Sequence, residues 1–273
     1  MKEHALSCLE MEILSYIESN KGMVLELLKQ KFFESSSTKS FQAVIKKLEI
    51  QKYLKKCQQY PKAPVFVFLT LKARTQLQKQ GGAYLPASLR QPKINIFERQ
   101  HDFCVQQIRM SIENSKNAWK DFVWLSDYEM RCGMNLSWKK NKTLLRPFQK
   151  YTRIPDGIFE IRLNGHLVHF VLEYEHAAYS HRQIQRMVMG LQRTFPDFLF
   201  LIVARNKIRT LRLARIIDPW ISHQSSERDR WIFSFYEKAI QLPFEKIPWV
   251  NLNTEYAFFV EDSIKNFESL NPK

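Results

Sequence analysis

Two strand-like runs on either side of Asn164-Gly165 constrain this chain more than any other feature. Residues 158–161 and 167–175 are rich in Ile, Val, Phe and Leu, and Asn-Gly is the dipeptide that two-residue hairpin turns favour. Asp156 and Glu173 lie eight residues before and eight residues after this Asn-Gly pair. The pattern predicts an antiparallel hairpin that brings the two carboxylates close together.

Glu175 adds a third carboxylate to this predicted hairpin. Side chains alternate along a strand, so Glu173 and Glu175 project from one face and Tyr174 from the other. Clustered carboxylates repel one another unless a divalent cation neutralises them, and Mg²⁺ or Mn²⁺ prefers such oxygen ligands. A metal site of this kind supports phosphodiester chemistry. The alternative is that the two glutamates form a polar face of an edge strand, paired with Arg or His.

The first 80 residues have the pattern of a winged helix-turn-helix. Apolar residues recur at helical spacing in residues 9–17, 24–28 and 41–48, and Ser or Thr at 35–38 can cap the third helix. Residues 53–54 and 65–69 then read as two strands of a hairpin, followed by a helix at 70–80. We therefore expect a DNA-binding domain over residues 1–80.

Lys and Arg recur from residue 39 to residue 79, where Glu49 is the sole acid. The predicted third helix and wing are therefore basic, as a surface that contacts phosphates would be. Solvation of a lysine-rich face, and a role in protein docking, are the alternatives. The expected DNA contacts in this domain are Lys39, Gln42, Lys46, Lys47, Lys52, Lys55 and Lys56.

Residues 81–93 are rich in Gly and Pro, a composition typical of a linker. We therefore expect a second domain over residues 94–273. Its predicted elements are a helix at 94–112, strands at 122–125, 158–161, 167–175 and 198–203, and a packed aromatic C-terminal extension from residue 218, with a last strand at 254–260. A basic loop at 139–153 and a basic helical face after residue 204 are candidate walls of a DNA channel. The candidate contacts there are Lys139, Lys140, Arg205, Arg209 and Arg212.

The charge balance favours an anionic partner, either nucleic acid or an anionic membrane surface. The chain has 42 Lys and Arg against 27 Asp and Glu, a formal net charge of +15. Its apolar runs are strand-sized, so we expect no membrane span. The N-terminus lacks the layout of an export signal, and the four cysteines lack the spacing of a zinc finger or a disulfide framework. We therefore expect a cytoplasmic protein.

The order of these motifs resembles a known arrangement. Pro155-Asp156, the short hairpin and Glu173-x-Glu175, followed by a helix and an apolar strand, look like the core of the PD-(D/E)xK nucleases, a restriction-endonuclease-like fold. With the winged helix and the segments 97–102 and 124–129, residues 7–205 are similar to the replication-relaxation proteins and to plasmid mobilisation relaxases of the MobC class. The overall expectation is an α+β chain with a mixed sheet in its second domain.

The resemblance implies an enzyme that nicks one DNA strand at a plasmid transfer origin, with a metal held by Asp156 and Glu173 and accessory relaxosome and coupling proteins as partners. In the parent nuclease pattern a Lys stands where this chain has Glu175. In the relaxation group an acid at that position is usual, and a basic residue of the next helix follows it. Arg186 is the foremost candidate for that basic role, ahead of Arg182 and His181.

His101 matches the early motif of the same group, and a packed or hydrogen-bonded helix histidine is the alternative. A tyrosine nucleophile is disfavoured, because relaxases that use one carry a histidine triad, and this chain has no His-x-His motif. Two other functions stay open: a non-catalytic DNA-binding replication or regulatory protein on the same fold, and an endonuclease that cuts both strands.

Overall fold

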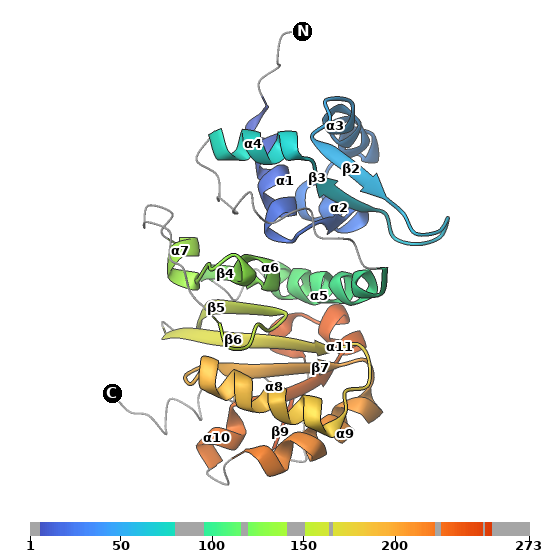
Figure 1. Ribbon diagram of the computed structural model, residues 1–273. Helices are drawn as coiled ribbons and strands as arrows, with labels where there is room; N and C mark the ends of the chain where they lie inside the picture. Colours follow the sequence, from blue (N-terminus) through green and yellow to red (C-terminus); the bar gives the residue numbers. More distant parts are fainter. Residues whose placement is uncertain are drawn as a thin grey trace. The chain divides into compact units, whose positions relative to one another are not determined.

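The structure is a computed structural model that describes residues 6–79, 96–115, 120–140, 151–163, 166–221, 225–247 and 249–252. The chain divides into two compact units, Met1–Gln106 and Gln107–Lys273, and the division falls inside helix α5 (Ile96–Asn114). Both units combine helices with strands, so the α+β class is confirmed (Figure 1). The predicted linker at 81–93 lies outside the described residues.

The first unit contains helices around a small antiparallel sheet. Its three strands are ordered β1-β3-β2. Its elements are α1 (Cys8–Ser19), β1 (Met23–Val24), α2 (Leu25–Phe33), α3 (Thr38–Ile50), β2 (Leu54–Cys57), β3 (Phe66–Leu69) and α4 (Leu71–Lys79).

The apolar positions read from the sequence form the core of this unit. Phe41, Ile45 and Leu48 are the buried residues of α3, and the Phe41 ring meets the Phe33 ring of α2 edge to face at 5.2 Å. Ser37 caps α3, because its side chain accepts a hydrogen bond from the Ser40 N–H. One face of α3 is therefore held against the core, and its opposite face is exposed.

Helix α5 begins in the first unit and supplies it with a buried polar contact. The Gln106 side-chain amide donates to the Gly22 carbonyl at 2.9 Å and accepts from the Val24 N–H at 3.2 Å. Both bonds satisfy backbone groups at the short strand β1, which explains why the start of α5 belongs to this unit. The unit boundary thus lies further along the chain than residue 94.

The second unit is built on a six-stranded mixed sheet in the order β4-β5-β6-β7-β8-β9. Strands β6, β7 and β8 run parallel, and the neighbours at both ends pair antiparallel. The strands are β4 (Lys120–Ser126), β5 (Gly157–Leu163), β6 (His166–Glu175), β7 (Leu199–Ala204), β8 (Trp231–Phe235) and β9 (Val250–Asn251). The helices are the end of α5, α6 (Asp127–Arg131), α7 (Leu136–Lys140), α8 (His181–Thr194), α9 (Lys207–Ile217), α10 (Ser225–Asp229) and α11 (Tyr236–Gln241), with 3-10 turns at Asp218–Trp220 and Phe244–Lys246.

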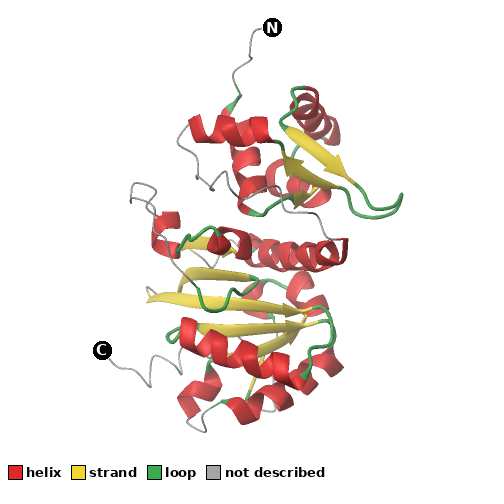
Figure 2. Cartoon of the chain, in the orientation of Figure 1, coloured by secondary structure: helices red, strands yellow, loops and turns green. Residues whose placement is uncertain are grey.

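Helices cover both faces of this sheet. In Figure 1 and Figure 2, α8 lies in front of the sheet below strand β6, and α9 packs beside α8 and against β7 and β8. On the other face, Phe159 and Phe170 stack at 4.8 Å, and both meet the Phe244 ring edge to face. Side chains of β6 therefore alternate between the α8–α9 layer and this aromatic layer.

The C-terminal extension is part of the sheet. Trp231 and Phe233 of β8 are fully buried, and β8 pairs in parallel with β7 from Phe200 to Ala204. The predicted last strand at 254–260 lies outside the described residues. In the part of the chain that the structure describes, no helix has the length and apolar character that a membrane crossing requires.

Candidate functional site

Asp156 lies beside the strand that carries Glu173, as the hairpin pattern predicts. Gly157 pairs with Leu172 in the ladder between β5 and β6. The Asp156 N–H donates to the Leu172 carbonyl at 3.1 Å, and the Tyr174 N–H donates to the Asp156 carboxylate at 2.7 Å. The side chain of Asp156 is thus fixed at the start of β5 by the backbone of β6.

Gly157 sets the path of the backbone next to Asp156. A Cβ at this position would lie 2.2 Å from Cζ2 of Trp124 on the neighbouring strand β4. Trp124 is buried and stacks on Phe159 at 5.6 Å, so it has no room to retreat. A glycine is therefore required here, and the Asp156 carboxylate is positioned by rigid neighbours.

Glu173 binds an arginine. Arg153 donates to Glu173 Oε1 through Nη2 at 2.9 Å and through Nε at 3.2 Å. The Glu173 side chain is 4 % exposed and that of Arg153 37 %. Burial disfavours the charged guanidinium, but the charge and hydrogen bonds of Glu173 outweigh it and raise the pKa of Arg153 above its ordinary value.

The segment that carries Arg153 is docked along α8. The Tyr151 ring stacks on Phe195 at 5.9 Å, and its hydroxyl donates to the Met134 carbonyl at 2.5 Å. At Gly190 a Cβ would stand 3.0 Å from the Cβ of Arg153. The lack of a side chain on this turn of α8 lets Arg153 approach the helix closely.

Glu175 binds a second arginine, on α9. Arg209 Nε donates to Glu175 Oε2 at 3.0 Å and Nη2 donates to Oε1 at 2.9 Å, which is a bidentate pair. The Tyr179 N–H also donates to Glu175 Oε1 at 3.3 Å. The Glu175 side chain is 4 % exposed, so the pair is buried on the carboxylate side.

The three predicted acids lie at the same end of the sheet. Asp156 immediately precedes β5 and is bonded to the backbone of β6, the strand that ends with Glu173 and Glu175. Tyr179 follows this strand, and burial, followed by the negative charges of Asp156 and Glu173, raises the pKa of its phenol.

The acids do not fit a metal ion in this arrangement. Guanidinium groups of Arg153 and Arg209 lie beside the oxygens of Glu173 and Glu175. Among the residues that the structure describes, no group of three or more His, Cys, Asp or Glu side chains is placed to hold a metal. The pairing with arginine, which the sequence left open as the alternative, is the arrangement observed.

The other predicted catalytic residues, Arg186 and His101, lie on helices α8 and α5. Arg186 is exposed on α8, whose buried residues are Ile184, Met187, Val188 and Leu191. His101 belongs to the first unit, where its ring nitrogen lies 3.5 Å from the Asp102 carboxylate. Arg153 and Arg209 form ion pairs with Glu173 and Glu175. Neither was predicted as a partner of the acids, since Arg209 was predicted as a DNA contact. The signal for Arg153 was the isolated Gly190 in a helical pattern, which indicates a close approach.

Lys139 and Lys140 are the last two residues of the short helix α7 and do not belong to a loop. Lys139 forms an ion pair with Glu129, and Lys140 forms one with Glu160. Both glutamates are almost fully buried, so they need these partners. The two lysines are therefore engaged in ion pairs within the protein, and their predicted phosphate contacts stay predictions. Residues 141–150 of the expected basic loop lie outside the described residues.

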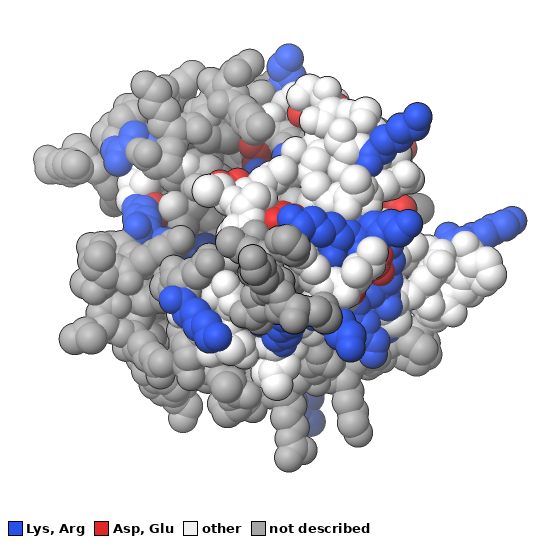
Figure 3. All heavy atoms as spheres, turned by 90° about the horizontal axis from the view of Figure 1, so that it is seen from above, with Lys and Arg blue, Asp and Glu red and all other residues white. Residues whose placement is uncertain are grey.

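The lysines of the first unit divide into two groups. Lys47 pairs with the buried Glu10, and Lys56 pairs with Glu49, each at 2.6 Å. The second group is exposed and has no ion pair among the described residues: Lys39, Lys46, Lys52 and Lys55. Gln42 is exposed on the same face of α3 as Lys39 and Lys46. On the face of the molecule seen in Figure 3, Lys and Arg side chains gather with smaller areas of Asp and Glu between them.

Arg205 and Arg212 are exposed, whereas Arg209 is half-buried against Glu175. The predicted basic face after strand β7 is thus present, but one of its members is turned toward the acid cluster. Comparison of the chain with family models, with curated proteins and with solved structures finds no match in any of the three.

Proposed function

We propose that this chain is a DNA-binding protein whose first unit is a winged helix-turn-helix. In this proposal α3 lies in the major groove and the hairpin of β2 and β3 is the wing that follows the DNA backbone. The observation that carries it is the exposed outer face of α3, with Lys39, Gln42 and Lys46, opposite a face locked into the core. Lys and Gln are residue types that contact phosphates and base edges.

The proposed wing, the hairpin of β2 and β3, also supports DNA binding, because its exposed side chains include lysines. Lys55 alternates outward on β2, where Leu54 is buried, and Lys62 is exposed in the loop between the two strands. Lys52 precedes the wing with a φ of 60°, a left-handed conformation that turns the chain sharply out of α3. The turn places the basic hairpin directly after the basic helix.

The salt dependence of DNA binding tests this proposal. A double variant, Lys39→Gln with Lys46→Gln, removes two exposed charges and is expected to reduce the log-log salt slope by about 1.8, since each phosphate contact contributes about 0.9. Fluorescence anisotropy with a labelled duplex at several salt concentrations measures the slope.

A matched double variant, Lys31→Gln with Lys79→Gln, carries the same change of net charge on α2 and α4. It is expected to change the slope far less. Equal slopes for the two double variants would show that net charge alone, and not the α3 face, attracts the DNA, and the proposal would then be wrong.

Metal-dependent nicking is the second candidate function. It is favoured by the position of Asp156 beside β6, the strand that carries Glu173 and Glu175. It requires the guanidinium groups of Arg153 and Arg209 to leave Glu173 and Glu175. The DNA target that the relaxase resemblance implies is a plasmid transfer origin, where accessory relaxosome and coupling proteins would act with this chain.

Supercoiled plasmid that carries the cognate origin, incubated with the protein and Mg²⁺ or Mn²⁺, tests this candidate. Conversion to open circles that is lost in both Asp156→Ala and Glu173→Ala is the expected result of nicking. Linear product would indicate cleavage of both strands. Binding without any conversion would leave DNA binding as the function and exclude the enzyme.

A further inference from the structure

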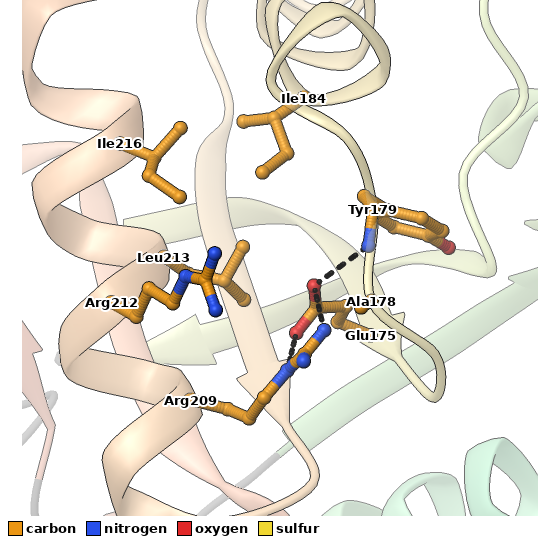
Figure 4. Close-up of a pocket in the computed structure, with 8 residues that line it drawn as sticks. All are labelled: Glu175, Ala178, Tyr179, Ile184, Arg209, Arg212, Leu213 and Ile216. Atoms are coloured by element: carbon orange, nitrogen blue, oxygen red, sulfur yellow. Dashed lines mark hydrogen bonds and ion pairs between the residues drawn. The ribbon is translucent and has the colours of Figure 1, made fainter.

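A small pocket lies between α8 and α9 at the end of strand β6 (Figure 4). Its polar lining comes from Glu175, Arg209 and Arg212, and its apolar walls include Ile184 and Leu213. In Figure 4 the Arg209 guanidinium meets the Glu175 carboxylate, and the Arg212 side chain extends from α9 on the side that faces the pocket. Two cations and one anion thus share the pocket, which leaves it with a net positive charge.

The guanidinium of Arg209 is held in a fixed orientation. Two of its nitrogens donate to the two oxygens of Glu175, and the Tyr179 N–H supplies a further donor to the carboxylate. This bidentate pair fixes the plane of the group, so the edge that Glu175 does not contact has a defined direction. The hydrogen bond with Glu175 also raises the pKa of Arg209, which keeps it charged.

The two helices that flank the pocket carry positive charge and no acid. Neither α8 nor α9 contains Asp or Glu. Their exposed basic residues, with the one that precedes α9, are Arg182, Arg186, Arg193, Arg205, Lys207, Arg212 and Arg215. This group of exposed arginines and one lysine on the helices that line the pocket favours a polyanion over a single small acid.

We propose that the pocket of Arg209 and Arg212 binds a phosphate group of a nucleic-acid backbone, with Glu175 as the residue that positions Arg209. This site adds a contact in the second unit to the DNA binding proposed for the first, and it rests on that function. In this proposal Glu175 does not bind a metal, as the sequence predicted, but orients a phosphate-binding arginine.

Arg212 provides the direct test, because it is exposed and has no ion pair among the described residues. In the full chain, Arg212→Gln is expected to weaken binding to labelled DNA about tenfold, the loss of one charged hydrogen-bonded contact. It is also expected to lower the salt slope by about 0.9. Arg212→Lys should restore the slope but only part of the affinity, since lysine lacks the planar fork.

Arg131→Gln is the matched control, since Arg131 is an exposed arginine of α6 that pairs with Asp127. It should leave both quantities near the wild-type values. If Arg212→Gln and Arg131→Gln bind DNA equally well, the pocket inference is overturned. The α3 double variant is measured in parallel. If only the α3 double variant loses DNA affinity, the phosphate site in the pocket is overturned and the proposed DNA-binding function is kept. If the wild-type protein has no affinity for DNA, both proposals are overturned.

Glu175→Gln tests the positioning role. The substitution raises the net charge by one, so electrostatics alone predicts tighter binding to DNA. Loss of the fixed orientation of Arg209 predicts weaker binding instead, and weaker binding by a variant that remains folded by circular dichroism supports the inference. Tighter binding would mean that Glu175 does not position the arginine.

Inorganic phosphate distinguishes a nucleic-acid strand from a free anion as the occupant. Calorimetric titration with phosphate at constant ionic strength, on wild type and Arg212→Gln, measures direct binding. Phosphate binding that depends on Arg212, together with weaker DNA binding by Arg212→Gln, supports the proposal. Phosphate binding with unchanged DNA affinity would assign the pocket to a free anion and overturn the backbone contact.

Discussion

Trp231→Ala is expected to lower the free energy of unfolding of the second unit by about 4 kcal/mol. Trp231 is fully buried on strand β8, and its ring stacks on Phe200 of β7 at 4.3 Å. Its removal leaves a large cavity between the α8–α9 layer and the sheet, which the neighbouring strands cannot fill. Urea denaturation followed by far-ultraviolet circular dichroism measures the change.

Two further variants serve as controls for this prediction. Trp231→Phe keeps most of the ring packing and removes an indole N–H that has no hydrogen-bond partner in the described structure. It should cost less than about 1.5 kcal/mol. Trp220→Ala, at a residue that is 41 % exposed, should stay within about 0.5 kcal/mol of wild type. A loss below about 1 kcal/mol for Trp231→Ala would contradict the placement of β8 in the core.

The position of β8 is also where prediction from the sequence was least complete. Trp231, Ile232 and Phe233 are buried on both faces of the sheet, so the strand lacks the alternation of apolar and polar residues that marks a half-buried strand. The density of aromatic residues predicted packing but not a strand parallel to β7. Parallel neighbours are joined by long crossovers, and the pairing partner of such a strand is not encoded locally.

Elements with one buried face were predicted best. The helical spacing of Phe41, Ile45 and Leu48 marks the core side of α3, and the structure places all three in the core. The Asn-Gly turn and the apolar runs around it predict the pairing of β5 with β6, and the observed register sets Gly157 opposite Leu172. Local pattern was sufficient in both cases, because the interacting residues are close in sequence.

The partners of the acids were not predictable in the same way. Arg153 is separated from Glu173 by 20 residues, and Arg209 from Glu175 by 34. Charge and spacing predict that buried carboxylates need a cation, but they do not distinguish a metal from a guanidinium. The choice depends on the approach of α9 and of the segment before β5, which is set by packing on α8.

Arg153→Met is the second variant with a large expected effect. It removes the cation that pairs with Glu173, whose side chain is 4 % exposed, and an uncompensated buried carboxylate is costly. Because Arg153 itself is partly exposed, water can reach the site, and we expect a loss of about 3 kcal/mol, at the lower end of the range for broken buried pairs. Urea denaturation measures it, and Arg131→Met at an exposed pair is the matched control.

The double variant Arg153→Met with Glu173→Met separates the loss of the pair from the cost of the unpaired charge. Replacement of both partners by apolar residues is expected to recover most of the stability. A double variant as unstable as Arg153→Met would mean that Arg153 acts through its packing against Gly190 and not through its charge. The pH dependence adds an independent check, because removal of the Arg153 guanidinium takes away a positive charge that favours the ionised form of the buried carboxylate. The deficit of Arg153→Met should therefore shrink as the pH falls and the carboxyl takes up its proton.

The same variant tests whether the acid cluster can accept a metal once a guanidinium has left it. If nicking is the function, Mn²⁺ should raise the melting temperature of Arg153→Met, since a cation that binds only the folded state stabilises it. Adding Asp156→Asn to Arg153→Met should abolish the shift, because it removes one of the two carboxylates that the relaxase resemblance assigns to the metal. An equal shift in both variants would locate the metal elsewhere. If Mn²⁺ shifts the melting temperature of neither variant, the acids serve as partners of arginine. Phosphate binding by Arg209 would then be the proposed function of this end of the sheet.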